Sequence, residues 1–158
     1  ECDTVLFARK LSIDLGGIAK GFIVDRVMER ILRHNVSNVI VNAGGDLRVE
    51  SSTGIPIAIR DPRDPVNFAE SVTISSGAMA TSAPYFTFSK LLNPHTGQLV
   101  EKLRSITVLA KSCMVADALT KAVALKANNL TSLLKCYGAS ALILDVAEDG
   151  ELRQEFYA

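Results

Sequence analysis

The stretch Asp14-Leu-Gly-Gly-Ile-Ala-Lys-Gly21 marks the point at which the chain changes from one hydrophobic period to another. Before it, over residues 5–15, apolar and polar residues alternate imperfectly, which predicts a β-strand. After it, over residues 18–34, apolar residues recur at helical spacing and predict a helix. The apolar face of that helix is expected to hold Phe22, Ile23, Val27, Met28, Ile31 and Leu32. The stretch itself is therefore predicted to be a strand end, a Gly-Gly turn and a helix start.

The same junction has the composition of an anion-binding site. Gly16 and Gly17 let a ligand approach the backbone closely, and the start of the next helix offers free N–H groups and a positive dipole end to a phosphate. Lys20 adds a cation in the first turn. The spacing is neither that of a P-loop nor that of GxGxxG, so those mechanisms are not implied. Tight packing of a helix on a strand is the alternative explanation of the glycines.

The rest of the chain predicts one α+β unit, in which an antiparallel sheet is covered by two or three helices. Further helices are expected at residues 113–126, with Met114, Ala118, Leu119, Ala122 and Leu125 on one side, and at residues 130–137. Pro56 makes its strand an edge or strand-start candidate, and a rigid loop is expected at residues 61–65. The expected strands are residues 39–42, of a buried type, and 47–49, 55–59, 71–74, 86–92, 105–109, 141–146 and 151–157. We treat residues 1–158 as a single domain or half-domain.

Composition excludes several classes of protein. The chain has 158 residues, 17 basic and 17 acidic, so its formal net charge is zero. That balance argues against a basic nucleic-acid groove or a helix for anionic membranes. A hydrophobic fraction of 48% with 22% charged residues rules out a disordered chain. No apolar stretch approaches the roughly 18 residues that span a bilayer.

Three more motifs carry groups that suit nucleotide chemistry. Asn42-Ala-Gly-Gly-Asp46 is a second paired glycine followed by a carboxylate, and a hairpin-type turn is its simplest explanation. Asp61 precedes Pro62, where a loop cap is the simplest role. Asp117 lies near the start of an otherwise apolar helix. It suits either the helix dipole or a phosphate site that holds Mg²⁺.

Taken in order and spacing, these motifs resemble the ApbE family of FAD:protein FMN transferases. The resemblance includes Val24-Asp25, Ala80-Thr-Ser82 and Asn93-Pro-His-Thr-Gly97, and it covers about residues 11–144. It implies an ApbE-like, T-fold-related architecture, FAD as substrate, and Mg²⁺-assisted transfer of FMN to a Thr or Ser of an acceptor protein, with AMP leaving. A typical member has about as much chain again before the first motif. The sequence therefore resembles the carboxy-terminal half of such a protein or a shortened relative.

The resemblance also implies roles for individual residues. The flavin nucleotide would lie against Gly16, Gly17, Ala19, Lys20, Asn42, Gly44, Gly45, Asp46 and Asp61. The Ala19 carbonyl and Asp117 would bind the metal, and Thr120 is the nearest hydroxyl to the family's metal-binding threonine. The resemblance further implies a periplasmic or membrane-anchored location.

The chain departs from the family pattern at three positions. Lys90 stands where the family has histidine, and Asn93 stands where it has aspartate, so the expected catalytic residues are altered. Lys121 occupies the threonine position, and Thr120, one residue earlier, is rotated by about 100° around the helix. Lys121 lies four residues after Asp117 and can pair with it, so we expect weak or absent metal dependence.

These departures leave three hypotheses open. The first is a flavin transferase. The second is a catalytically degenerate module of the same fold that binds a flavin nucleotide or an interaction partner. The third is a structural half-domain whose sheet is completed by a partner chain, either a second copy or an amino-terminal half.

Overall fold

The computed structural model describes residues 4–83, 91–94, 96–100 and 104–158. These residues form six strands and three helices. In chain order, the elements are α1 (Ala19–Leu32), β1 (Val39–Ala43), β2 (Asp46–Arg60), β3 (Phe68–Ser82), β4 (Arg104–Ala110), α2 (Cys113–Ala124), α3 (Leu130–Cys136), β5 (Ser140–Val146) and β6 (Leu152–Tyr157). No helix among the described residues is long and apolar enough to cross a membrane.

The strands form one sheet in the order β1-β2-β3-β4-β5-β6, and every neighbouring pair is antiparallel. β1 pairs with only the first part of β2, where Val39 lies opposite Glu50. Pro56 lies beyond that region and faces only β3, opposite Thr73. The edge position predicted from Pro56 therefore holds only for this part of β2, which lies between β1 and β3 in the sheet order, and the strand-start alternative is wrong because β2 begins at Asp46. The predicted α+β architecture is confirmed.

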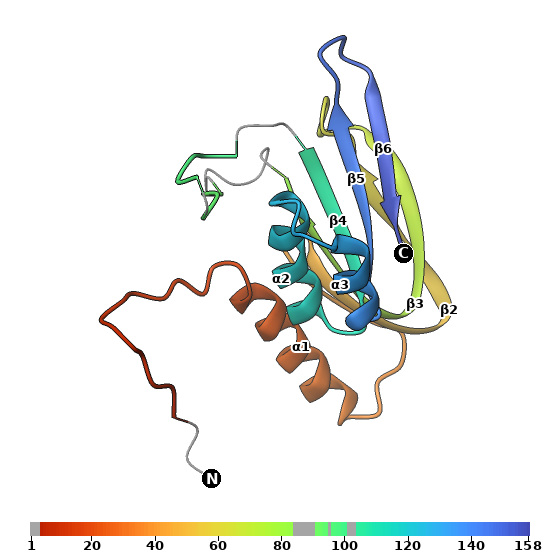
Figure 1. Cartoon of the computed structure of the whole chain (residues 1–158). Coiled ribbons are helices and arrows are strands. Elements are labelled where there is room, and N and C mark those ends of the chain that lie inside the picture. Colours follow the sequence, from red (N-terminus) through yellow and green to blue (C-terminus); the bar gives the residue numbers. More distant parts are fainter. Residues whose placement is uncertain (1–3, 84–90, 95, 101–103) are drawn as a thin grey trace.

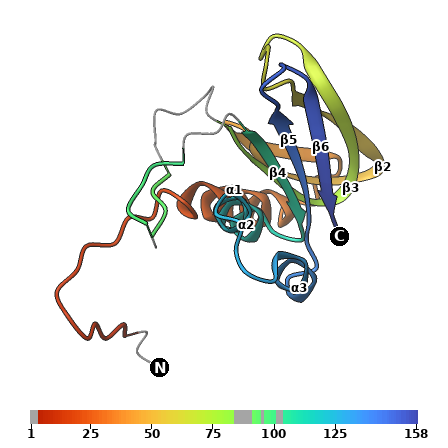
Figure 2. The same cartoon turned by 45° about the horizontal axis from the view of Figure 1, so that its top comes forward.

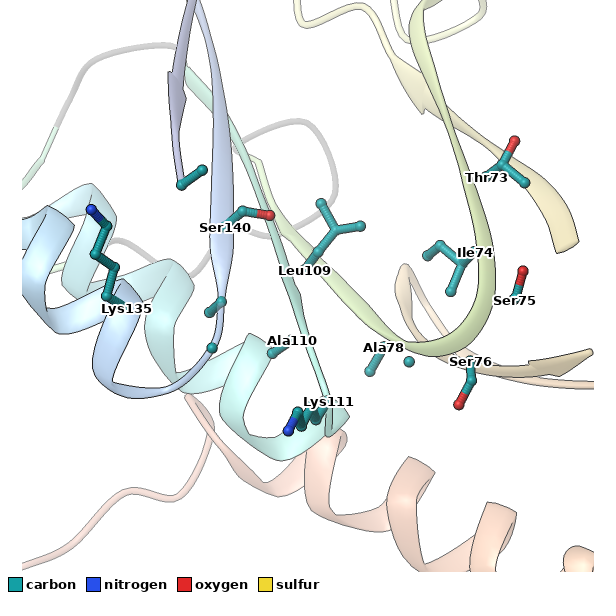
Figure 3. Close-up of a pocket in the computed structure, with 14 residues that line it drawn as sticks. Thr73, Ile74, Ser75, Ser76, Ala78, Leu109, Ala110, Lys111, Lys135 and Ser140 are labelled. Carbon is teal, nitrogen blue, oxygen red and sulfur yellow. The ribbon is translucent and has the colours of Figure 1, made fainter.

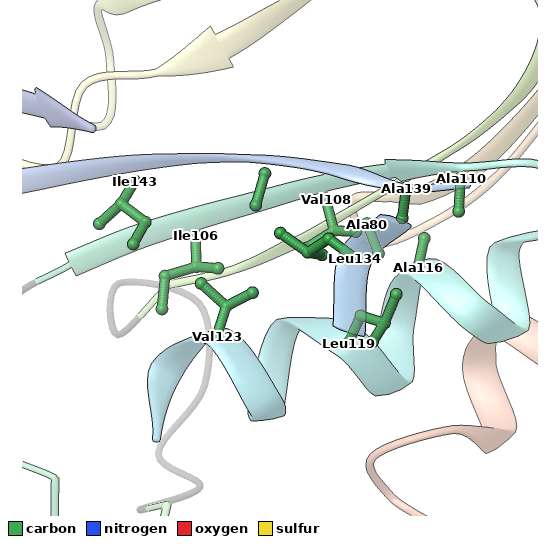
Figure 4. Packing of buried hydrophobic residues seen from close by; sticks show 11 residues of the cluster. Ala80, Ile106, Val108, Ala110, Ala116, Leu119, Val123, Leu134, Ala139 and Ile143 are labelled. Carbon is green, nitrogen blue, oxygen red and sulfur yellow. The ribbon is translucent and has the colours of Figure 1, made fainter. Parts of the chain in front are cut away.

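The three helices lie on one face of the sheet (Figures 1 and 2). α1 packs on β1 and β2, α2 on β3 and β4, and α3 on β5. Between α2 and the sheet, small and branched residues form the main core, which Figure 4 shows from close by. Val108 and Val123 are both fully buried in it, so the position of α2 on β4 is fixed by apolar packing.

The opposite face is covered by the sheet itself, because the long β2–β3 hairpin curls over it (Figure 2). Its core includes Val49 of β2 and Leu144 of β5, both fully buried. The Gln154 amide of β6 donates to Glu70 Oε1 of β3 over 2.8 Å, although β4 and β5 lie between these two strands in the sheet. The curl therefore encloses a second core without a second layer of helices.

Residues 5–15 do not form the predicted strand. Residues 4–15 contain no strand and run away from the sheet (Figure 1). Their apolar residues are exposed, with Leu6 at 93% and Ile13 at 60%. The alternation is present in the sequence, but a strand also needs a neighbour to satisfy its backbone hydrogen bonds, and none of the described residues provides one.

The predicted face of α1 is wrong for three of its six residues, whereas Met28 is buried as predicted. Phe22, Ile23 and Val27 are 50%, 56% and 41% exposed, and the buried residues of the helix are Gly21, Val24, Asp25 and Met28. In α2 the buried face is likewise shifted, to Cys113, Ala116, Asp117, Leu119, Thr120 and Val123. Both helices bury small or polar residues, such as Gly21 and Asp25 in α1 and Asp117 in α2. A face predicted from apolar residues alone does not include them.

The remaining elements differ from prediction mainly in their ends. β2 and β3 each run for 15 residues, so the strands predicted at 47–49 and 55–59 are parts of one strand. β1 is partly exposed rather than buried, because it lies at the sheet edge. Of the strand predicted at 86–92, residues 86–90 lie outside the described part, and Leu92 makes only an isolated bridge with Leu99.

Gly21 decides how α1 faces the molecule, because α1 meets the start of α2 there. A Cβ added at Gly21 would lie 2.3 Å from the Cys113 carbonyl oxygen and 2.7 Å from Met114 Cα. Both are backbone atoms, so no side-chain rotation relieves the overlap. Close approach of the two helices therefore requires glycine at this position.

We expect Gly21→Ala to lower the free energy of unfolding by at least about 1–3 kcal/mol, the usual cost of overpacking, because the helices must separate. Chemical denaturation monitored by circular dichroism measures this. Arg30→Ala, on the exposed side of the same helix, is the control and should change stability by less than about 0.5 kcal/mol. Equal stability of Gly21→Ala and wild type would contradict the close contact.

Candidate functional site

The first polar contact of the site joins the start of α1 to the start of β2. Lys20 Nζ lies 2.7 Å from Asp46 Oδ2. The carboxylate is buried, with 2% of its side chain exposed, whereas the lysine side chain is 48% exposed. Asp46 Oδ2 accepts no well-aligned hydrogen bond from the described residues, so this contact is an ion pair. Two motifs that are distant in sequence therefore meet through opposite charges.

The second contact joins the start of α1 to α2. Asp117 is completely buried, and its Oδ2 accepts a hydrogen bond of 3.2 Å from the Gly21 backbone N–H. Its Oδ1 is paired with Lys121 Nζ, which also donates to the Asp117 backbone carbonyl over 3.1 Å. The predicted pairing of Lys121 with Asp117 is therefore present in the structure. A carboxylate at the N-terminus of α1 also complements the dipole of that helix.

Asp25 holds this arrangement together, and the sequence analysis gave it no role. Its carboxylate accepts from the backbone N–H groups of Cys113 and Met114, each over 2.9 Å, and from Arg48 Nη1 over 3.1 Å. It therefore caps α2 from another helix, in addition to Ser112. The signal available in the sequence was the Val24-Asp25 pair within the resemblance, since the buried face of α1 to which Asp25 belongs was not predicted.

The charges influence one another. Burial opposes the charged form of Lys20, but the contact with Asp46 and the charges of Asp46 and Asp117 outweigh it and raise the pKa of Lys20. Burial, followed by the charge of Asp117, raises the pKa of Asp46 against the opposing effects of Lys20 and Lys121. Both pKa values are raised, which favours the charged form of Lys20 and disfavours the charged form of Asp46, because Asp46 is buried beside a second carboxylate. We call these four side chains the cluster: Lys20, Asp46, Asp117 and Lys121.

Cys113 lies next to that cluster but is not a nucleophile. It is completely buried at the first residue of α2. Burial first, and then the charges of Asp46, Asp25 and Asp117, raise the pKa of its thiol to about 12. The thiolate is the reactive form of cysteine, so a thiol with this pKa is inert at neutral pH.

The predicted site residues at the Gly-Gly turn lie beside the cluster. Gly16 and Gly17 form the turn before α1, and Ala19 is the first helical residue. The Gly16 N–H donates to Asp14 Oδ1 over 2.7 Å. A Cβ at Gly17 would lie 3.5 Å from Lys121 Cε, so the lysine stem runs past this glycine.

The second paired glycine forms the hairpin turn between β1 and β2. Gly44 and Gly45 have φ values of +67° and +99°, a combination that suits a two-residue hairpin loop. Asn42 Oδ1 accepts a hydrogen bond of 3.0 Å from the Gly45 N–H. The simplest explanation of this motif is thus correct, and the turn also sets Asp46 at the first position of β2.

Asp61 is not brought to the cluster. It follows the far end of β2, 15 residues after Asp46, and pairs with Arg63 over 2.7 Å. Hydrogen bonds from the Arg63 side chain are the main cause of the lowered pKa of Asp61. The hydrogen bonds to Asp61, and to a smaller extent the charge of Glu151 at the β5–β6 turn, raise the pKa of Arg63. Asp61 therefore caps a loop at the opposite end of the strand.

The predicted catalytic residues do not join the cluster within the described part of the chain. Lys90 lies outside the described residues. Asn93 belongs to a turn, where its Oδ1 accepts from the Thr96 N–H over 3.3 Å. It borders a hollow of about 260 Å³ with Ala124, at the C-terminal end of α2, and none of the cluster residues lines that hollow.

The implied metal ligands do not fit a divalent ion as they stand. The two carboxylate oxygens of Asp117 already contact Lys121 and Gly21. The Thr120 hydroxyl donates to the Asp117 carbonyl over 2.7 Å within its own helix. Among the described residues, no group of three or more His, Cys, Asp or Glu side chains could hold a metal ion. Mg²⁺ prefers six oxygen ligands in octahedral geometry, which this set does not supply.

A second, larger hollow lies away from the cluster, between the bend in β3, the end of β4 and the start of β5 (Figure 3). Its volume is about 590 Å³, and Lys111 and Lys135 line it together with Ser75 and Ser140. None of the predicted site residues borders it. Volume alone therefore does not identify the site that the motifs predict.

Comparison with known proteins connects this arrangement to a family. The FAD:protein FMN transferase of Vibrio cholerae is 35% identical over 124 residues, covering 70% of this chain and 37% of that protein. The Haemophilus influenzae protein of the same name is 36% identical over 123 residues, covering 68% and 36%. The solved ApbE protein of Thermotoga maritima superposes with a TM-score of 0.74 at 31% identity, over 90% of this chain and 51% of that one.

The chain thus spans little more than a third of these curated relatives and about half of the solved chain. The ApbE family model matches residues 3–143, which is most of the sequence. The Gly-Gly turn, the second paired glycine and Asp117, which the fold brings together, all lie within the matched range. The chain belongs to the ApbE family.

Proposed function

We propose that this chain binds FAD at the Gly16–Gly17 turn and takes part in the transfer of FMN to a hydroxyl of an acceptor protein. The observation that carries the proposal is the convergence of Lys20, Asp46 and Asp117 on the start of α1. Three separate motifs supply these residues. The relatives named FAD:protein FMN transferase support the choice of ligand and reaction.

The start of α1 supplies groups that suit a diphosphate. Ile18, at the N-cap position, makes no side-chain capping hydrogen bond. The Ala19 N–H donates to the Leu15 carbonyl and the Gly21 N–H to Asp117 Oδ2, so among the described contacts the Lys20 N–H is the first-turn donor left for a ligand. Lys20 is half exposed and positively charged. Helix N–H groups together with an ammonium are a common way to bind phosphate. The glycines permit close approach of the ligand to the backbone.

The reaction is a substitution at phosphorus. The acceptor hydroxyl oxygen forms a bond to the FMN phosphorus of FAD, and the bond from that phosphorus to the bridging oxygen breaks. AMP leaves with the bridging oxygen, and the hydroxyl proton passes to solvent. The residues of this chain bind and orient the diphosphate and neutralise its charge, which are the main protein contributions to such transfers. Mg²⁺ supplies charge stabilisation in the reaction that the resemblance implies, but the oxygen ligands here do not fit it.

FAD should bind more tightly than riboflavin, because riboflavin has no phosphate to meet Lys20 and the start of α1. Lys20→Ala should weaken FAD binding by roughly 1–3 kcal/mol and leave riboflavin unaffected. Isothermal titration calorimetry measures both. Lys135→Ala, at an exposed lysine beside the other hollow, is the matched control. Lys20→Ala with Asp46→Asn removes both charges and separates loss of a ligand contact from exposure of an unpaired carboxylate. Equal affinities for FAD and riboflavin would refute the phosphate assignment.

Transfer itself should release AMP. We expect AMP to accumulate when the protein is incubated with FAD and a flavin-accepting protein, in amounts equal to the flavin that becomes covalently bound. Chromatography of AMP and in-gel flavin fluorescence measure the two products. Asp117→Asn should reduce both together. FAD binding without AMP release would leave this chain as a binding module.

A further inference from the structure

Lys121 forms an ion pair with Asp117, whose carboxylate is completely buried. Its Nζ contacts Asp117 Oδ1 and lies 3.1 Å from the carbonyl oxygen of the same residue. Its stem passes Gly17, where an added Cβ would lie within 3.5–3.8 Å of three lysine carbons. The ammonium is therefore held between α2 and the Gly-Gly turn.

The charges around Lys121 balance without another cation. Asp46 and Asp117 are both buried, and burial together with the charge of Asp117 raises the pKa of Asp46. Lys20 and Lys121 bring two positive charges to these two carboxylates. Without Lys121, a completely buried carboxylate would lack its counter-ion, which is costly in a folded protein. A divalent ion at Asp117 would have to displace Lys121.

Lys121 also retains a donor for a ligand. An ammonium has three N–H groups, and the described contacts use two of them, both on Asp117. The side chain is 29% exposed, and its stem runs along Gly17 of the turn. A diphosphate bound at Gly16 and Gly17 would lie near the positive charge of Lys121. Without that charge, a metal ion would be needed there to offset the repulsion between the diphosphate and Asp117.

We propose that Lys121 is a built-in cation that takes the place of a divalent metal at Asp117, so that the protein binds a diphosphate without Mg²⁺. The ligand class, the diphosphate of FAD, rests on the function proposed above. The replacement of a metal by Lys121 rests on the Asp117 contacts and can be tested in the protein without flavin.

The first test is thermal unfolding of the flavin-free protein in EDTA and in millimolar MgCl₂ at matched ionic strength. The midpoint of wild type should be the same in both. Lys121→Thr removes the cation and adds a hydroxyl, so its midpoint should be lower in EDTA and should rise with MgCl₂. Lys121→Arg keeps the charge and should remain insensitive to Mg²⁺. Lys135→Thr, an exposed lysine in α3, is the control for loss of a lysine.

The second test is FAD binding by calorimetry under the same conditions. Wild-type affinity should change by less than about twofold between EDTA and MgCl₂, whereas Lys121→Thr should gain about tenfold or more from Mg²⁺. A clear Mg²⁺ effect on wild type in either test would overturn the proposal, as would a Lys121→Thr variant that ignores Mg²⁺ in both. If wild type bound no FAD at all, the proposed function would fail, and the flavin-free unfolding test would still decide the role of Lys121.

Discussion

The close contact between Gly21 and the backbone of Cys113 and Met114 is the constraint on which the rest of the site depends. Because the two helices touch there, Asp25 of α1 reaches the first N–H groups of α2, and Asp117 of α2 reaches the Gly21 N–H of α1. Each helix thus supplies a carboxylate to the N-terminus of the other, where the dipole favours negative charge. Larger residues at the contact would separate both pairs at once.

This reciprocal arrangement explains why so much charge can be buried in a small domain. Asp25, Asp46 and Asp117 are all buried, and each has a basic partner, in Arg48, Lys20 and Lys121 respectively. Buried ion pairs seldom add stability when compared with apolar residues of similar volume, because desolvation offsets the attraction. Stability alone therefore does not account for these three pairs, which fix the starts of α1 and α2 relative to β2.

Local patterns predicted the elements but not always their faces. Strands and helices were found because periodicity and turn residues act within a few positions, and the Gly44–Gly45 hairpin follows from its dipeptide. The face of α1 was predicted correctly at Met28 but not at Phe22, Ile23 and Val27, because Gly21 and Asp25 turn inward and neither contributes to an apolar count. The strand at residues 5–15 was wrong because pairing depends on a neighbour that the pattern does not report. In each case, a contact distant in sequence decided the outcome.

The same distinction applies to the site. The pairing of Lys121 with Asp117 was predictable because four residues on a helix fix the spacing of two side chains. Asp61 could not be placed in this way, because a 15-residue strand separates it from Asp46 and carries it toward Glu151. Motif order along the chain therefore identified the residues of one family, while helix geometry identified which of them touch. Where a departure from the family pattern falls on a helix, as at Lys121, its structural consequence can be derived directly. Where motifs lie at opposite ends of a strand, as with Asp46 and Asp61, shared family membership gives no information about their proximity.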